Sequence, residues 1–137
     1  MVIENTKSMI NVSLLLLYSL FLLLLSGLKS AQLCLPFISA LEVTLGGDKF
    51  MHFYLAWLLS FLAWPVALLI NNKKYSTFIL SALLFSFLSV SLLLDELLQL
   101  MVISRHFDLS DTLFGVSGLG LGLLFRITLY KSFLLLK

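Results

Sequence analysis

Asp48 and His52 are the first residues along this chain whose types and spacing suggest chemistry. They stand four residues apart in GGDKFMH (46–52), directly before a long apolar stretch. On a helix this spacing places both side chains on one face, where a carboxylate can hold an imidazole in a single tautomer. An aspartate in this position can also cap the helix that it begins. Two interpretations therefore stand side by side, a structural cap and an acid–histidine pair that belongs to a site.

A second polar group interrupts the apolar segment LLLDELLQL (92–100). Asp95, Glu96 and Gln99 share one broad face of the predicted helix. The line that runs inward from Glu96 as far as Ala82 consists of small residues, which is typical of a contact between membrane helices. We therefore expect Glu96 to point into a helix bundle, with Asp95 nearer the margin. The alternative is that both acids extend to the lipid headgroups.

The third polar segment, ISRHFDLSD (103–111), supplies Arg105 and Asp111. A guanidinium such as that of Arg105 can pair with one of the acids, or with a phosphate or carboxylate on a ligand. Asp111 also begins a stripe in which glycines follow at intervals of four, three and four residues. Glycines on one face let two helices approach closely, so the stripe predicts a helix contact that directs Asp111 into the bundle. The predicted packing residues are Gly115, Gly118 and Gly122.

The elements that carry these residues are predicted to be transmembrane helices. Of 137 residues, 61% are hydrophobic and only 12% are charged, a balance typical of an integral membrane protein. Runs such as LLLLYSLFLLLL are apolar on every side, which excludes the alternating strands of a barrel. Four stretches have the length of a span, at about 9–28, 49–70, 76–103 and 111–130. The sequence thus predicts an all-α membrane protein, with one four-helix domain over residues 1–137.

The connection between the first two predicted spans is LCLPFISALEVTL (33–45). Pro36 is favourable in the first turn of a helix, and the apolar residues that follow predict a short helix lying in the membrane interface. The first apolar stretch is longer than the core of a signal peptide and lacks a clear cleavage site, so we interpret it as a retained anchor.

The distribution of basic residues predicts the orientation in the membrane. Bases in short loops favour the cytoplasm, and placing both termini there puts six bases inside and three outside. The inner set is Lys7, Lys73, Lys74, Arg126, Lys131 and Lys137, and the outer set is Lys29, Lys49 and Arg105. Six of the seven acids then fall on the outer side. Any site built from these groups is expected to face outward.

Taken in order, Asp48-Lys49-x-x-His52, Glu96-x-x-Gln99, Arg105 and a glycine-rich last helix resemble the VanZ-like family of small bacterial membrane proteins. The family is named for a protein associated with resistance to the glycopeptide teicoplanin. The similarity covers about residues 48–122, and the chain departs from the pattern at Ala56, Ile103-Ser104 and Gly115. The resemblance implies a multi-pass protein of the bacterial cytoplasmic membrane. It also implies a ligand site formed by Asp48, Lys49, His52, Glu96, Gln99, Arg105 and Asp111.

Three functions remain open from the sequence. The leading hypothesis is an envelope protein whose outward polar pocket binds an amphiphile, such as a lipid-linked cell-wall intermediate, a lipid headgroup or a lipophilic glycopeptide. The second is an enzyme acting on a membrane lipid, with His52 or Glu96 as general acid or base. The third is a small subunit that binds a partner in a larger membrane complex, with the polar cluster serving only structure.

Cofactors, metals and nucleic acids are not expected from the sequence. No group of residues has the spacing of a zinc site, although Asp95, Glu96 and Asp111 form an alternative set for a divalent cation. The net charge of +2 gives no basis for binding nucleic acid.

Overall fold

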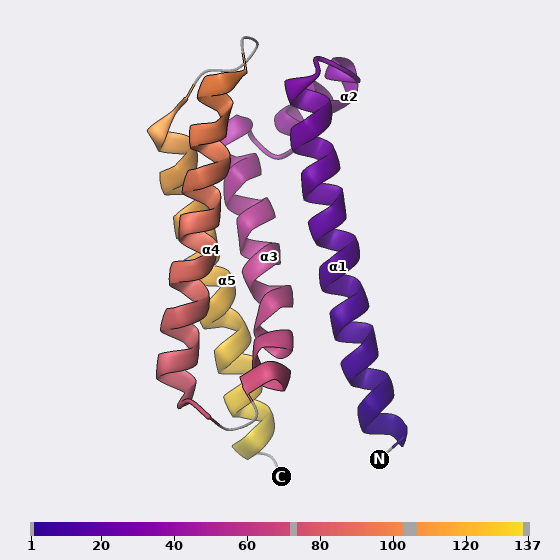
Figure 1. The fold of residues 1–137 in the computed structure, drawn as a ribbon, viewed down its shortest axis with the longest axis vertical. Coiled ribbons are helices and arrows are strands. Elements are labelled where there is room, and N and C mark those ends of the chain that lie inside the picture. The colour runs from indigo at the N-terminus through magenta and orange to yellow at the C-terminus, as the bar shows by residue number, and fades with distance from the viewer. Residues whose placement is uncertain (1, 72–73, 103–106, 136–137) are drawn as a thin grey trace.

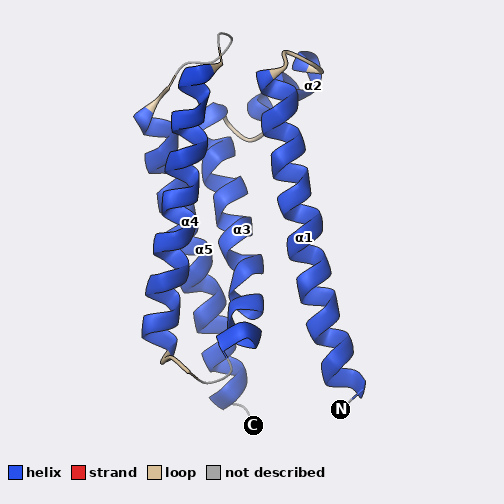
Figure 2. Cartoon of the chain, in the orientation of Figure 1, coloured by secondary structure: helices blue, strands red, loops and turns tan. Residues whose placement is uncertain are grey.

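The fold is a bundle of apolar helices (Figure 1). A computed structural model describes residues 2–71, 74–102 and 107–135. Its elements are α1 (Val2–Ser30), α2 (Leu35–Thr44), α3 (Asp48–Asn71), α4 (Thr77–Leu98), the single-turn η1 (Gln99–Met101) and α5 (Leu109–Leu135). Figure 2 shows helices and loops but no strand over these residues. α1, α3, α4 and α5 are long and apolar enough to cross a membrane, which confirms the predicted all-α class with four candidate spans.

The helix ends differ from the predicted ones chiefly at the two termini of the chain. α1 begins at Val2 and α5 continues to Leu135, because residues next to an apolar stretch can extend a helix that has already formed. Between them, the predicted short helix is present as α2, with Pro36 in its first turn. Gly46 and Gly47 then have φ values of 93° and 114°, a region that favours glycine, and turn the chain into α3.

The core of the bundle lies among α3, α4 and α5. One buried cluster joins Ala56, Leu88 and Leu119, and a second joins Trp64 to Leu123 farther along the same helices. α4 directs leucines at four-residue spacing toward these clusters. Ala82 and Ser86 are exposed, so the predicted contact along the line of small residues is wrong at these two positions, whereas the Ser89 hydroxyl is buried. The leucine face replaces it because the larger side chains fill the space between the helices and gain van der Waals contacts.

The glycine stripe of α5 lies against α3. A Cβ atom added at Gly118 would overlap the backbone carbonyl of Phe53, and one added at Gly122 would overlap that of Trp57. At Gly115 the same atom would lie 2.9 Å from Cδ1 of Leu92 and 4.0 Å from the carbonyl oxygen of His52. The absent side chains therefore set the separation of α3 and α5, and with it the distance between the residues at their ends.

α1 is attached more loosely than the other long helices and runs beside α3 (Figure 1). In the most apolar stretch of α1 only 6% of the residues are buried inside the chain, against 28% in the corresponding stretch of α5. The Tyr18 hydroxyl donates a hydrogen bond of 2.8 Å to the carbonyl oxygen of Leu55, linking α1 to the middle of α3. The rest of α1 presents apolar side chains outward, as expected for a helix in contact with lipid.

Candidate functional site

The polar residues of the sequence converge at one end of the bundle. The last turns of α1 and α4, the first turns of α3 and α5, and all of α2 lie at this end, which is uppermost in Figure 1. Within the described ranges 6–71, 74–102 and 107–132, every ion pair between side chains is found there. We call this region the polar end.

Lys29 is the central cation of the polar end. Its Nζ lies 2.7 Å from Oε1 of Glu42 and donates a hydrogen bond of 2.8 Å to Oδ1 of Asp48. One lysine thereby joins the last turn of α1 to α2 and to the first turn of α3. Sequence reasoning missed this role. The available signal was a lone base at the predicted outer end of the first apolar stretch, a position that calls for acidic partners.

Asp48, His52 and Asp111 are brought together from two helices. Nε2 of His52 lies 3.7 Å from Oδ1 of Asp48, one turn away on α3, and 3.9 Å from Oδ2 of Asp111 on α5. His52 is half-buried, whereas Asp111 is only 8% exposed. Among the described residues, no backbone N–H donates to the Asp48 carboxylate, which is engaged by Lys29 instead. Asp48 therefore binds neighbouring side chains, and its carboxylate makes no capping hydrogen bond among the described residues.

Glu96 and Gln99 form a separate buried pair. The Gln99 Nε2 donates a hydrogen bond of 2.8 Å to Oε2 of Glu96, and the two residues are 5% and 3% exposed respectively. The backbone N–H of Asp108 donates to the other oxygen, Oε1, at 2.9 Å. Glu96 thus fastens the end of α4 to the segment that leads into α5. Both of its oxygens are used in this connection.

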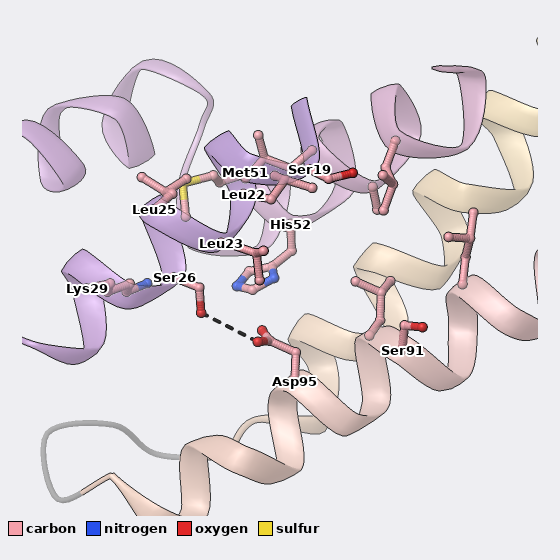
Figure 3. A pocket seen from close by; sticks show the side chains of 15 residues that line it. Ser19, Leu22, Leu23, Leu25, Ser26, Lys29, Met51, His52, Ser91 and Asp95 are labelled. Atoms are coloured by element: carbon pink, nitrogen blue, oxygen red, sulfur yellow. Dashed lines mark hydrogen bonds between the residues drawn. The ribbon is translucent and has the colours of Figure 1, made fainter. Parts of the chain in front are cut away.

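Asp95 and Lys49 lie on either side of these buried groups. Asp95 faces α1, where the Ser26 hydroxyl donates to its Oδ1 at 3.5 Å (Figure 3). Lys49 is exposed and pairs with Oδ2 of Asp108 at 3.3 Å, and it also contacts Ser110. Hydrogen bonds from Ser110, together with the ammonium of Lys49, lower the pKa of Asp108 below its usual value. Arg105 lies outside the described residues.

A groove of about 330 Å³ opens between α1, α3 and α4, directly below the polar end (Figure 3). Seven of its fifteen lining residues are leucines, and Met51 and Ala56 add to the apolar lining. Three ionisable side chains line its upper part and point toward the space between the helices, namely Lys29, His52 and Asp95. The groove was not predicted from sequence, because it arises from the loose packing of α1.

Comparisons with protein-family models, with curated proteins and with solved structures give no match to this chain. The residues and their geometry are therefore what indicates its function. That geometry joins an apolar groove to a half-buried acid–histidine–lysine cluster, at one end of a bundle with four candidate membrane spans.

Proposed function

We propose that this membrane protein binds an amphiphile, holding an apolar chain in the groove and a polar head beside Lys29, His52 and Asp95. The two-part lining of the groove carries this proposal, because leucines form its walls while ionisable groups gather at one end. An amphiphile has the same division between an apolar body and a polar head. Binding it would place each part against matching surroundings.

The size of the groove favours a single chain. Small-molecule sites in proteins occupy roughly 300–1,000 Å³, and this groove, at about 330 Å³, lies near the lower limit. One acyl or prenyl chain fits such a space better than the paired tails of a diacyl lipid. Because α1 buries so little of its surface against the bundle, a chain can reach the groove from within the membrane.

We place the polar end on the outer face of the bacterial cytoplasmic membrane. The excess of bases at the opposite end supports this orientation. The resemblance to the VanZ-like family suggests the envelope setting. Lipid-linked cell-wall precursors, lipid headgroups and lipophilic glycopeptides are the ligands that this setting suggests.

The orientation has a direct test, because Cys34 is the single cysteine of the sequence and is exposed at the polar end. In intact cells, a membrane-impermeant maleimide is expected to label this thiol. The label adds mass, so the gel mobility of the purified protein measures the labelled fraction. Cys34→Ser, which has no thiol, gives the background signal. Labelling that requires permeabilised cells would place the polar end in the cytoplasm.

Ligand binding is tested with a single-chain phospholipid that carries a diazirine in its acyl chain. After irradiation of the purified full-length protein in nanodiscs, we expect adducts on groove residues of α1 and α3, such as Leu22 and Leu59. Ser91→Trp should lower their yield at least about tenfold, because an indole side chain occupies space that the lipid chain needs.

Ser117→Trp is the matched control. Both serines are exposed and donate to the carbonyl oxygen four residues earlier, but Ser117 lies on α5 and does not line the groove. Labelling of the groove should be unchanged in this variant. Labelling spread evenly over the lipid-facing helices, with equal yields in all three proteins, would contradict amphiphile binding and favour a structural subunit of a larger complex.

A further inference from the structure

This inference rests on the proposed function. An amphiphile whose head carries phosphate would have to bind at a polar end that is acidic. The carboxylates that pair with Lys29 or His52 are Glu42, Asp48 and Asp111. With all three ionised, three negative charges face the one ammonium of Lys29, which leaves a balance of two negative charges. A phosphate would be repelled by this balance, and a divalent cation would neutralise it.

We propose that Asp48, His52 and Asp111 bind one divalent transition-metal ion of the Zn²⁺ class at the head of the groove. Each offers one ligand atom, and these three atoms all lie within 4.8 Å of one another. An imidazole nitrogen with two carboxylate oxygens is a donor set that such ions accept. Three protein ligands leave at least one coordination position for a further group, here an oxygen of the amphiphile's phosphate.

The distances suit a site that closes slightly around the ion. Zinc binds nitrogen and oxygen at roughly 2.0–2.2 Å, so two of its ligands cannot lie more than about 4.4 Å apart. Nε2 of His52 is already within that limit of both aspartates, at 3.7 Å from Asp48 and 3.9 Å from Asp111. The three ligand atoms lie within 4.8 Å of one another, so the two carboxylates would have to move by less than about 1 Å to meet the limit.

Asp111 has an ion-pair partner but lacks a hydrogen-bond donor. Its side chain is 11% exposed, and its carboxylate faces His52 at 3.9 Å without receiving a hydrogen bond from any residue in the described part of the chain. A buried carboxylate in a membrane protein normally has a close partner. Neither Asp95 nor Glu96 joins it, because Asp95 faces α1 and Glu96 is bonded to Gln99 and Asp108.

The surrounding structure holds the ligands as metal sites require. Lys29 donates to Oδ1 of Asp48, the same oxygen that lies 3.7 Å from Nε2 of His52, and thereby fixes the orientation of that carboxylate. Gly115, one turn after Asp111, brings α5 to the turn of α3 that carries His52. His52 also lines the groove, so an ion bound there would face the space where a ligand's head lies.

The site is tested by adding Co²⁺ and Zn²⁺ to the full-length protein after chelator treatment. We expect one equivalent of Co²⁺ to give visible absorption bands, which Zn²⁺ then displaces. His52→Ala and Asp111→Asn should each weaken Zn²⁺ binding at least about tenfold. Asp108→Asn removes an exposed acid of the same polar end that lies outside both the triad and the groove, and it should change the affinity by less than about twofold.

A wild-type protein that binds neither ion, or variants that all bind equally, would overturn the metal site. Thermal unfolding of each variant checks that a loss of binding is not a loss of fold, and Asp111→Glu, which keeps the carboxylate, should retain measurable binding.

Lipid labelling separates the two proposals. With the phosphate-headed diazirine probe, groove labelling is expected to fall after addition of a chelator, while an uncharged monoacylglycerol probe should be unaffected. Groove labelling of both probes that persists in chelator contradicts the metal-dependent head site but leaves amphiphile binding intact. Stoichiometric Zn²⁺ binding without groove labelling contradicts amphiphile binding alone.

Discussion

Gly118→Ala is expected to destabilise the bundle by about 2 kcal/mol. The added Cβ meets the backbone carbonyl of Phe53, which cannot rotate away, so α3 and α5 must separate. Overpacking of a tight contact costs up to about 3 kcal/mol. Alanine has a better helix propensity than glycine, which offsets about 1 kcal/mol of this cost. Titration with SDS from mild detergent, followed by the fluorescence of Trp57 and Trp64, measures the change.

Gly120→Ala is the control for this substitution. Gly120 lies on the same helix, but a Cβ there would sit 3.7 Å from the Phe85 ring, an ordinary contact. We expect its unfolding transition to be unchanged or slightly raised. Equal behaviour of the two variants would mean that the close approach of α3 and α5 is not required for stability.

Glu96→Leu is expected to cost on the order of 3 kcal/mol of unfolding free energy. The substitution removes the acceptor of two hydrogen bonds, leaving the buried Gln99 amide and the Asp108 N–H without a partner. Each unsatisfied buried group costs about 1–3 kcal/mol. The same SDS titration measures the loss, and Glu96→Gln, which keeps one acceptor oxygen, should fall between the wild type and Glu96→Leu.

Asp95→Leu tests whether the effect belongs to this connection. The neighbouring acid is exposed and makes a single long contact with Ser26, so its removal should change stability by less than about 1 kcal/mol. A Glu96→Leu protein with wild-type stability but without groove labelling would contradict the structural role. Such a result would indicate that Glu96 belongs to the ligand site suggested by the sequence.

The helices were predictable because membrane spans depend on local properties. Length and uniform apolarity are readable in one stretch at a time, and the intervals that lead from Asp111 to Gly122 are readable within one helix. The presence of α2 likewise followed from Pro36 and the apolar residues after it. The side of the membrane on which α2 lies cannot be read from one stretch, because the count of basic residues describes the insertion of the whole chain.

The pairing of side chains was less predictable, because it depends on how the helices meet. Glu96 and Asp111 resemble each other in sequence, yet Glu96 bonds to Gln99 and Asp108 while Asp111 faces His52. The small-residue line had the right composition for a contact, but Ser86 and Ala82 face outward. Lys29 gained its importance only through α2, which brings Glu42 back to it.

Two connections between α1 and α3 lie along the groove and affect how fast a ligand exchanges. Tyr18 holds α1 to Leu55, which lines the groove, and Lys29 holds it to Asp48 at the polar end. A chain that enters sideways must slide between these connections or wait for one of them to break. Residence time would then follow the opening of α1, a helix motion of the microsecond-to-millisecond range, more than the strength of contact with the leucine walls.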